Sequence, residues 1–183
     1  MSKPWIQTYT GKKFHFLQCR ADEIDIDDIA HALSNICRFN GHCSKFYSVA
    51  EHSIYVSQLV SPHLALSGLL HDAGEAYIGD IVQPQKDYIQ NVREIEDRIM
   101  TMVAVKFGLK YQFYKLNDIK RVDRRLCYTE GSQLMPNVTE WNIQETPYEM
   151  SIQCFAPRIA KFGFLKRFWS IYDDSEDITG YKK

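Results

Sequence analysis

The sequence lacks several features that would assign it to a large class of proteins at once. No apolar run approaches the roughly 20 residues that a membrane-spanning helix needs, and the first residues lack the apolar core of a signal peptide. The net charge is −1, with 22 basic and 23 acidic residues. No broad positive surface is therefore expected. We expect a cytoplasmic protein that binds neither a nucleic-acid polymer nor a membrane.

A paired set of cysteines is also missing. The five cysteines are odd in number and form no CxxC motif, so we expect free thiols in a reducing compartment. Cys37, His42 and Cys43 lie close together without a fourth ligand nearby, and ordinary core or loop cysteines are the simpler interpretation. None of the six histidines follows His71. This excludes a second metal site built from downstream histidines, but not one held by carboxylates and water.

What the sequence does contain is a succession of helical patterns. Hydrophobic residues make up 45% of the 183 positions, enough for a sizeable core in one domain over residues 1–183. Alternation over residues 5–17 around Gly11 predicts a short β-hairpin. Apolar spacing and end signals predict six helices. These run from the acidic segment 22–28 to 36, over 47–61, from 62 through 80, over 87–107, over 116–134 and from 157 onward. We expect a loop over 137–155 and a polar, frayed tail over 173–183. The expected fold class is an all-α bundle with a small N-terminal β-hairpin.

The segment around residues 69–80 carries the chemistry. After the apolar run 65–70, four candidate ligands or proton carriers follow within ten positions: His71, Asp72, Glu75 and Asp80. Residues three and four apart share a helix face, so a helix would place Glu75 beside His71 and Asp72. An imidazole next to a carboxylate can begin a divalent metal site. The alternative is a helix end with solvated acids and one hydrogen-bonded histidine.

Two other helices offer further ligands. His52 shares an apolar stripe with Val56 and Leu59, where a hydrogen-bonded core histidine is the ordinary alternative. Asp123 lies beside Val122, near the core, or else pairs with a basic neighbour at the surface. If the three helices pack together, two imidazoles and two carboxylates can converge on one ion. Such nitrogen and oxygen ligands suit Zn²⁺, Mn²⁺, Co²⁺, Fe²⁺ or Ni²⁺.

This pattern of His52, His71, Asp72 and Asp123 resembles the H…HD…D signature of the HD-domain metal-dependent phosphohydrolases. The resemblance covers about residues 9–134. Residues 48–53 and 71–81, followed by Pro84 and Lys86, are similar to the 5'-deoxynucleotidase branch, which includes phage dATP triphosphohydrolases. Residues 35–42 look most like the compact phage and prophage members. The resemblance implies an HD-domain helical bundle.

The resemblance also implies a role for each matched residue. His52, His71, Asp72 and Asp123 would hold one divalent metal ion. Glu75 would be the general acid/base next to the attacking water.

The remaining matched residues would bind the nucleotide. Arg38 would contact phosphate, Lys86 would lie at the mouth of the site, and Asp80 would lie close to the leaving group or the sugar. Phe39 takes a position where the best-known bacterial members carry Trp, which packs near the deoxyribose and helps to exclude a 2'-hydroxyl. This difference affects how strictly the site would select deoxyribose over ribose. Pro84 would shape the same wall. His42 either faces the phosphate or only structures its loop.

The leading hypothesis is an enzyme that releases phosphate from 2'-deoxynucleoside 5'-monophosphates. Release of triphosphate from a dNTP, especially dATP, on the same residues is the nearest alternative. A non-catalytic nucleotide- or metal-binding module is a third, against which the presence of both Glu75 and Asp80 argues. Because family members assemble as dimers or hexamers, the resemblance also implies a homo-oligomer.

Overall fold

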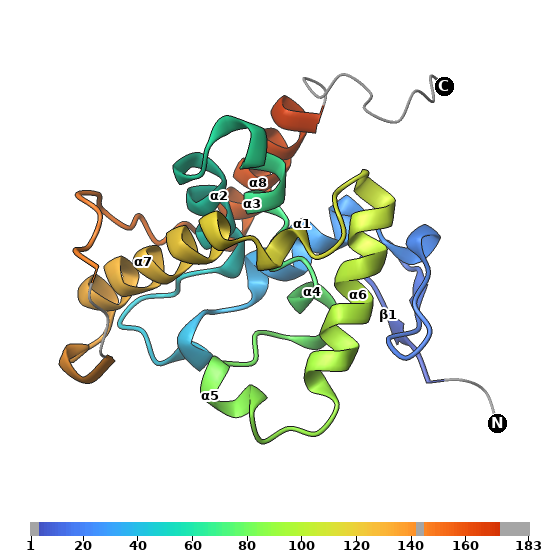
Figure 1. The fold of residues 1–183 in the computed structure, drawn as a ribbon, viewed down its shortest axis with the longest axis horizontal. Coiled ribbons are helices and arrows are strands. Elements are labelled where there is room, and N and C mark those ends of the chain that lie inside the picture. Colours follow the sequence, from blue (N-terminus) through green and yellow to red (C-terminus); the bar gives the residue numbers. More distant parts are fainter. Residues whose placement is uncertain (1–3, 142–144, 173–183) are drawn as a thin grey trace.

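The structure is a computed structural model that describes residues 4–141 and 145–172, and its class is mostly all-α (Figure 1). The predicted tail over 173–183 lies outside the described residues. The helices are α1 (Ile26–Asn35), α2 (Val49–Leu59), α3 (Ala65–Leu69), α4 (Glu75–Ile78), α5 (Gln83–Lys86), α6 (Val92–Phe107), α7 (Asn117–Leu134) and α8 (Pro157–Tyr172). Short 3₁₀ turns include η2 (Phe39–Gly41), η3 (Pro62–Leu64) and η5 (Thr139–Trp141). Among the described residues, no helix combines the length and the apolar character that crossing a membrane would require.

The predicted N-terminal hairpin is confirmed. Strand β1 (Ile6–Gln7) pairs antiparallel with β2 (Lys13–Phe14), and Gly11 in the turn has φ 85°, a conformation that glycine adopts without strain. Asp28 of α1 accepts hydrogen bonds from the backbone N–H and the hydroxyl of Thr10, at 2.6 and 2.9 Å. These bonds tie the hairpin to the helical body.

Most predicted helix ends are also found, with two corrections. Ser48 caps α2 by accepting from the N–H of Glu51, and Gly108 ends α6 with φ 67°. The long helix begins at Val92 instead of residue 87, because Asn91 is left-handed with φ 64° and interrupts the pattern. The loop predicted over 137–155 contains the 3₁₀ turn η5.

The single helix predicted through residue 80 is wrong. Helix α3 ends at Leu69, residues 71–74 form a turn, and α4 starts at Glu75. A continuing helix would pair the Gly68 carbonyl with the N–H of Asp72. That carbonyl accepts a hydrogen bond from Nδ1 of His71, at 2.8 Å. A side chain thus competes for a backbone acceptor, and the turn replaces the helix.

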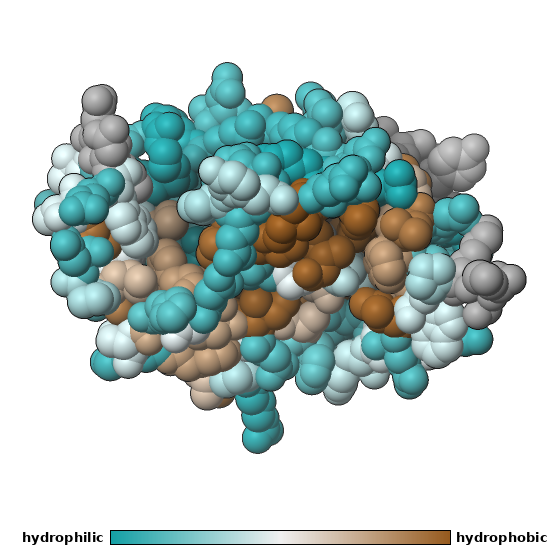
Figure 2. All heavy atoms as spheres, turned by 90° about the horizontal axis from the view of Figure 1, so that it is seen from below, coloured by the Kyte–Doolittle hydropathy of each residue, from teal (hydrophilic) through white to brown (hydrophobic). Residues whose placement is uncertain are grey.

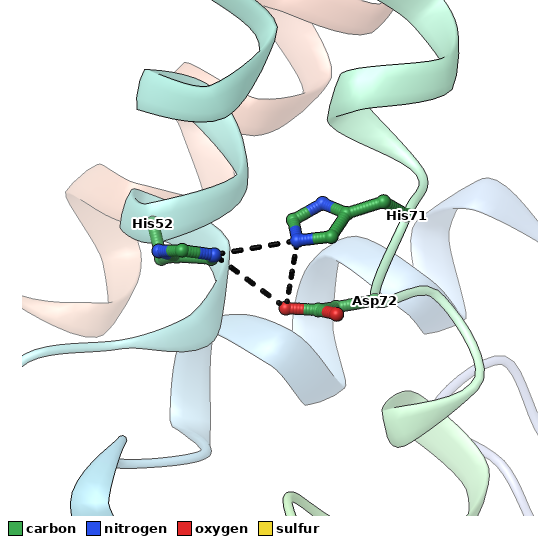
Figure 3. A group of neighbouring side chains, drawn as sticks. All are labelled: His52, His71 and Asp72. Carbon is green, nitrogen blue, oxygen red and sulfur yellow. Dashed lines mark hydrogen bonds and ion pairs between the residues drawn. The ribbon is translucent and has the colours of Figure 1, made fainter. Parts of the chain in front are cut away.

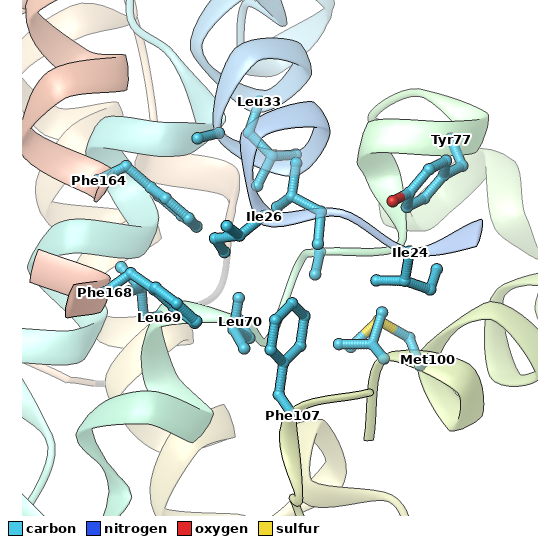
Figure 4. Packing of buried hydrophobic residues seen from close by; sticks show 14 of the residues in the cluster. Ile24, Ile26, Leu33, Leu69, Leu70, Tyr77, Met100, Phe107, Phe164 and Phe168 are labelled. Atoms are coloured by element: carbon cyan, nitrogen blue, oxygen red, sulfur yellow. The ribbon is translucent and has the colours of Figure 1, made fainter. Parts of the chain in front are cut away.

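The hydrophobic core lies between α1, α3, α6 and α8 (Figure 4). Phe164 and Phe168 of α8 reach Leu69 of α3, while Met100 and Phe107 bring in α6. Helix α2 packs against α1, α3, α7 and α8, so any side chain on its inner face is held on several sides. This rigid position is the one that His52 occupies.

One face of the molecule exposes apolar side chains. Figure 2 shows the structure from below the view of Figure 1, with hydrophobic side chains gathered across the centre of that face and hydrophilic ones around them. Helix α5, which carries Pro84 and Lys86, lies at this lower edge in Figure 1.

Candidate metal centre

Three side chains from two parts of the chain point at one another (Figure 3). His52 comes from α2, and His71 and Asp72 come from the turn after α3. The two Nε2 atoms lie 3.3 Å apart, and Oδ2 of Asp72 lies 3.7 Å from His52 Nε2 and 3.2 Å from His71 Nε2. All three ligand atoms fall within 4.8 Å of one another. This His-His-Asp group could hold a metal ion.

Asp123 on α7 joins this group. Its Oδ1 lies 3.1 Å from Nε2 of His52 and 3.9 Å from Nε2 of His71. The structure therefore brings His52, His71 and Asp72 together and places Asp123 against the two imidazoles. The Asp123 side chain is 39% exposed, whereas that of His52 is fully buried. The group is thus closed on the α2 side and accessible on the α7 side.

The Nδ1 atoms of both imidazoles are engaged, which determines what their Nε2 atoms can do. Nδ1 of His71 faces the Gly68 carbonyl, which can only accept. Nδ1 of His52 lies 2.6 Å from Oε1 of Glu130, again an acceptor when ionised. Each Nδ1 therefore carries the proton and donates. The Nε2 atom of each ring, once free of a proton, can then offer its lone pair to a metal ion.

The donor set fits a divalent cation. The two Nε2 atoms and the Asp72 oxygen, which lie this close together, repel one another unless a proton or a metal ion lies among them. Ligands about 2.1 Å from one ion would lie about 3.0 Å apart in octahedral and about 3.4 Å apart in tetrahedral geometry. The observed separations of His52 and His71 from each other and from the two carboxylates run from 3.1 to 3.9 Å.

Glu130 contacts the side of the His52 ring that faces away from the other ligands. This residue was not identified from the sequence. It is fully buried on α7. Its Oε1 also accepts from the hydroxyl of Tyr47 at 2.6 Å, and its Oε2 accepts from Nε of Arg38 at 3.1 Å. Burial alone would raise the pKa of Glu130, but Arg38 and His52 outweigh it and lower that pKa. The one available signal was spacing, because Glu130 lies seven residues after Asp123 and so shares its helix face.

Glu75 begins α4 beside this centre. Its side chain is buried, and its Oε2 has no hydrogen-bond partner among the described residues. Burial and the charges of Asp72 and Asp80 raise the pKa of Glu75 well above its usual range. Asp80 follows a turn at Gly79, which has φ 83°, and burial raises the Asp80 pKa too. A buried carboxyl that has a raised pKa and an oxygen without a hydrogen-bond partner is suited to proton transfer.

Arg38 lies beside Asp72 of the metal group and is already paired. Besides Glu130, its Nη1 lies 3.8 Å from Oδ2 of Asp72. The next residue, Phe39, has φ 56°, an uncommon conformation for a bulky side chain. Its ring lies 5.8 Å from that of Trp141 and under the Arg38 guanidinium. The structure thus joins Arg38 and Phe39 in one wall and adds Trp141, which the sequence did not single out.

Lys86 and Pro84 lie together on α5. The Lys86 ammonium donates to Oε1 of Glu96 on α6 at 2.7 Å, so the lysine is tethered to α6. Its charge still acts on Glu75, whose pKa it lowers against the effect of burial. His42, by contrast, is exposed beyond η2.

Comparison with known proteins gives relatives without a stated activity. No family model matches the chain. A protein of Escherichia coli K12 called YfdR, described as uncharacterized, is 46% identical over 105 residues, which cover 57% of this chain and 59% of YfdR. An uncharacterized protein of Rhodobacter capsulatus is 35% identical over 119 residues, covering 60% of this chain and 61% of that protein. The chain thus spans about three-fifths of the length of these relatives.

Proposed function

We propose that this chain is a metal-dependent phosphohydrolase that releases phosphate from 2'-deoxynucleoside 5'-monophosphates. The observation that carries the proposal is the convergence of His52, His71, Asp72 and Asp123 next to Glu75, a buried carboxyl whose Oε2 has no hydrogen-bond partner among the described residues. The resemblance of the same residues to HD-domain phosphohydrolases supplies the reaction and the substrate class.

The side chains around the centre suit phosphoryl transfer, which depends on positioning and charge neutralisation. His52, His71, Asp72 and Asp123 would hold the ion. A bound divalent ion would polarise the phosphoryl group and activate water. Arg38, held in place by Glu130, would present its guanidinium to the phosphate oxygens.

The proton would be handled by Glu75. Burial and the charges of Asp72 and Asp80 raise its pKa well above the usual range, which favours the protonated form that a general acid requires. Asp80 would lie toward the leaving group. Phe39 would form the sugar side of the wall, and Pro84 and Lys86 would border its mouth.

The test is hydrolysis by the purified chain after chelator treatment and addition of Mn²⁺ or Co²⁺. We expect free phosphate and deoxyadenosine from dAMP, no product without metal, and no product from the Asp72→Ala variant. AMP, the ribose counterpart, tests the choice of sugar. Release of triphosphate from dATP with no phosphate from dAMP would replace the monophosphate with the triphosphate as substrate. No turnover of either nucleotide with Mn²⁺, Co²⁺, Zn²⁺, Fe²⁺ or Ni²⁺ would overturn the proposal.

A further inference from the structure

We infer that Glu130 is a positioning residue that fixes the ring of His52 for metal binding and, through its second oxygen, fixes Arg38 for the phosphate. This inference deepens the proposed function and rests on it for the role of Arg38. The part that concerns the metal rests only on the geometry of the buried group.

The contacts of Glu130 show why a carboxylate is required at this position. Oε1 accepts from two donors, Nδ1 of His52 and the hydroxyl of Tyr47, both at 2.6 Å. Oε2 accepts from Nε of Arg38 at 3.1 Å. An ionised carboxylate offers acceptors on both oxygens and no donor, so it satisfies all three groups at once.

An amide of the same shape cannot do this. If glutamine at position 130 turned its oxygen toward His52 and Tyr47, its NH₂ group would face the Nε–H of Arg38, donor against donor. If it turned the other way, the NH₂ group would face Nδ1 of His52. That nitrogen would have to accept, and the ring proton would move to Nε2, the atom that faces the metal ligands. In the first orientation Arg38 loses its acceptor and His52 donates to a neutral amide oxygen, which is a weaker acceptor than a carboxylate. In the second orientation the His52 tautomer is reversed. Both orientations therefore weaken the hold on His52, and the first also releases Arg38.

The location of Glu130 distinguishes a role in positioning His52 from a role in general packing. Glu130 is fully buried and lies on the opposite side of the His52 ring from Asp72 and Asp123, which face Nε2. It therefore acts on the metal through other residues: directly through His52, and at longer range through Arg38, whose Nη1 lies 3.8 Å from Oδ2 of Asp72. Outer-shell carboxylates that hold a ligand histidine commonly change metal affinity by about 10- to 100-fold when replaced. A residue that served only the fold would change the stability of the protein and leave this affinity as it was.

The test is the affinity of the metal-free chain for Mn²⁺, measured by titration calorimetry, together with its stability, measured by urea unfolding. We expect Glu130→Gln to raise the Kd for Mn²⁺ by about 10- to 100-fold. The matched control is Glu51→Gln, which also replaces a fully buried carboxylate, one residue before His52. We expect it to lower the unfolding midpoint and keep the wild-type Kd.

A second variant covers the case in which Glu130→Gln does not fold. Glu130→Asp keeps the charge but withdraws the oxygens by one methylene, so we expect it to weaken Mn²⁺ binding while it retains a cooperative unfolding transition. A wild-type Kd in a folded Glu130→Gln or Glu130→Asp chain would overturn the inference. So would a wild-type chain that binds none of Mn²⁺, Co²⁺ and Zn²⁺. A wild-type chain that binds Mn²⁺ and hydrolyses no nucleotide would overturn the proposed function and leave this test intact.

Discussion

His71 and Asp72 are neighbours in the chain, yet Nε2 of one and Oδ2 of the other lie 3.2 Å apart. Consecutive side chains on an α-helix diverge by about 100°, so this approach requires the turn over residues 71–74. The bond from Nδ1 of His71 to the Gly68 carbonyl anchors that turn. Two ligands are therefore delivered by one short segment, and the cluster needs only α2 and α7 to complete it.

Replacing Asp72 should remove the metal. Asp72→Ala deletes one of the four proposed ligands and leaves His71 without its nearest carboxylate. We expect the Kd for Mn²⁺ to rise by more than about 100-fold, beyond the range typical of outer-shell changes. The check is metal content after dialysis. Asp80→Asn is the control, because Asp80 is not part of the ligand group, and it should keep its metal. One equivalent of metal retained by Asp72→Ala would show that the ligand set is wrong.

Replacing Glu75 should separate catalysis from metal binding. Glu75→Gln keeps the shape of the side chain and removes its ability to take a proton. We expect kcat for dAMP to fall by about 10²- to 10⁴-fold, the usual contribution of a general acid/base, with unchanged Mn²⁺ content. Full hydrolysis by this variant would assign the proton transfer to another group.

The sequence predicted the helices well and the details of the site unevenly. Apolar spacing and end signals were enough for α2, α7 and α8, since these helices bury continuous stripes. The turn at residues 71–74 could not be predicted, because it depends on a side-chain contact to a carbonyl three residues earlier. Glu130 was missed for a related reason. A buried acid leaves no pattern of its own, and its partners His52, Tyr47 and Arg38 are 78 to 92 residues away.

Metal affinity should rise with pH. Burial and Arg38 act to lower the pKa of His52, but Glu130 and Asp123 outweigh them and raise it to about 9. In the metal-free chain His52 thus carries an extra proton at neutral pH, and metal binding must release it. We expect the apparent association constant to increase about tenfold per pH unit between pH 6.5 and 8.5, and to level off above the pKa of His52.

Calorimetry in two buffers of different ionisation enthalpy measures that released proton directly. About one proton should leave for each ion bound at pH 7. A flat affinity over this range, with no proton released, would mean that His52 is neutral before the metal arrives.

The buried carboxylate of Glu51 on α2 binds the loop that precedes α8. Its Oε1 accepts from the backbone N–H groups of Gln153 and Cys154 at 3.1 and 3.0 Å, and its Oε2 accepts from that of Phe155 at 2.6 Å. The hydroxyl of Tyr55 donates to Oε1 at 3.1 Å. Residues 153–155 have no helix or strand of their own to satisfy these groups. One carboxylate thus satisfies three backbone donors that would otherwise require water.

Glu51→Gln should therefore destabilise the fold by about 3 kcal/mol, because an amide NH₂ group would face backbone donors in a buried site. Urea unfolding followed by circular dichroism measures the loss. Glu149→Gln is the matched control: the same change, at an exposed acid in the same loop, should stay within about 0.5 kcal/mol of wild type. Equal stabilities for the two variants would mean that water replaces the Glu51 contacts without cost, and that the loop is held to α2 by its other packing.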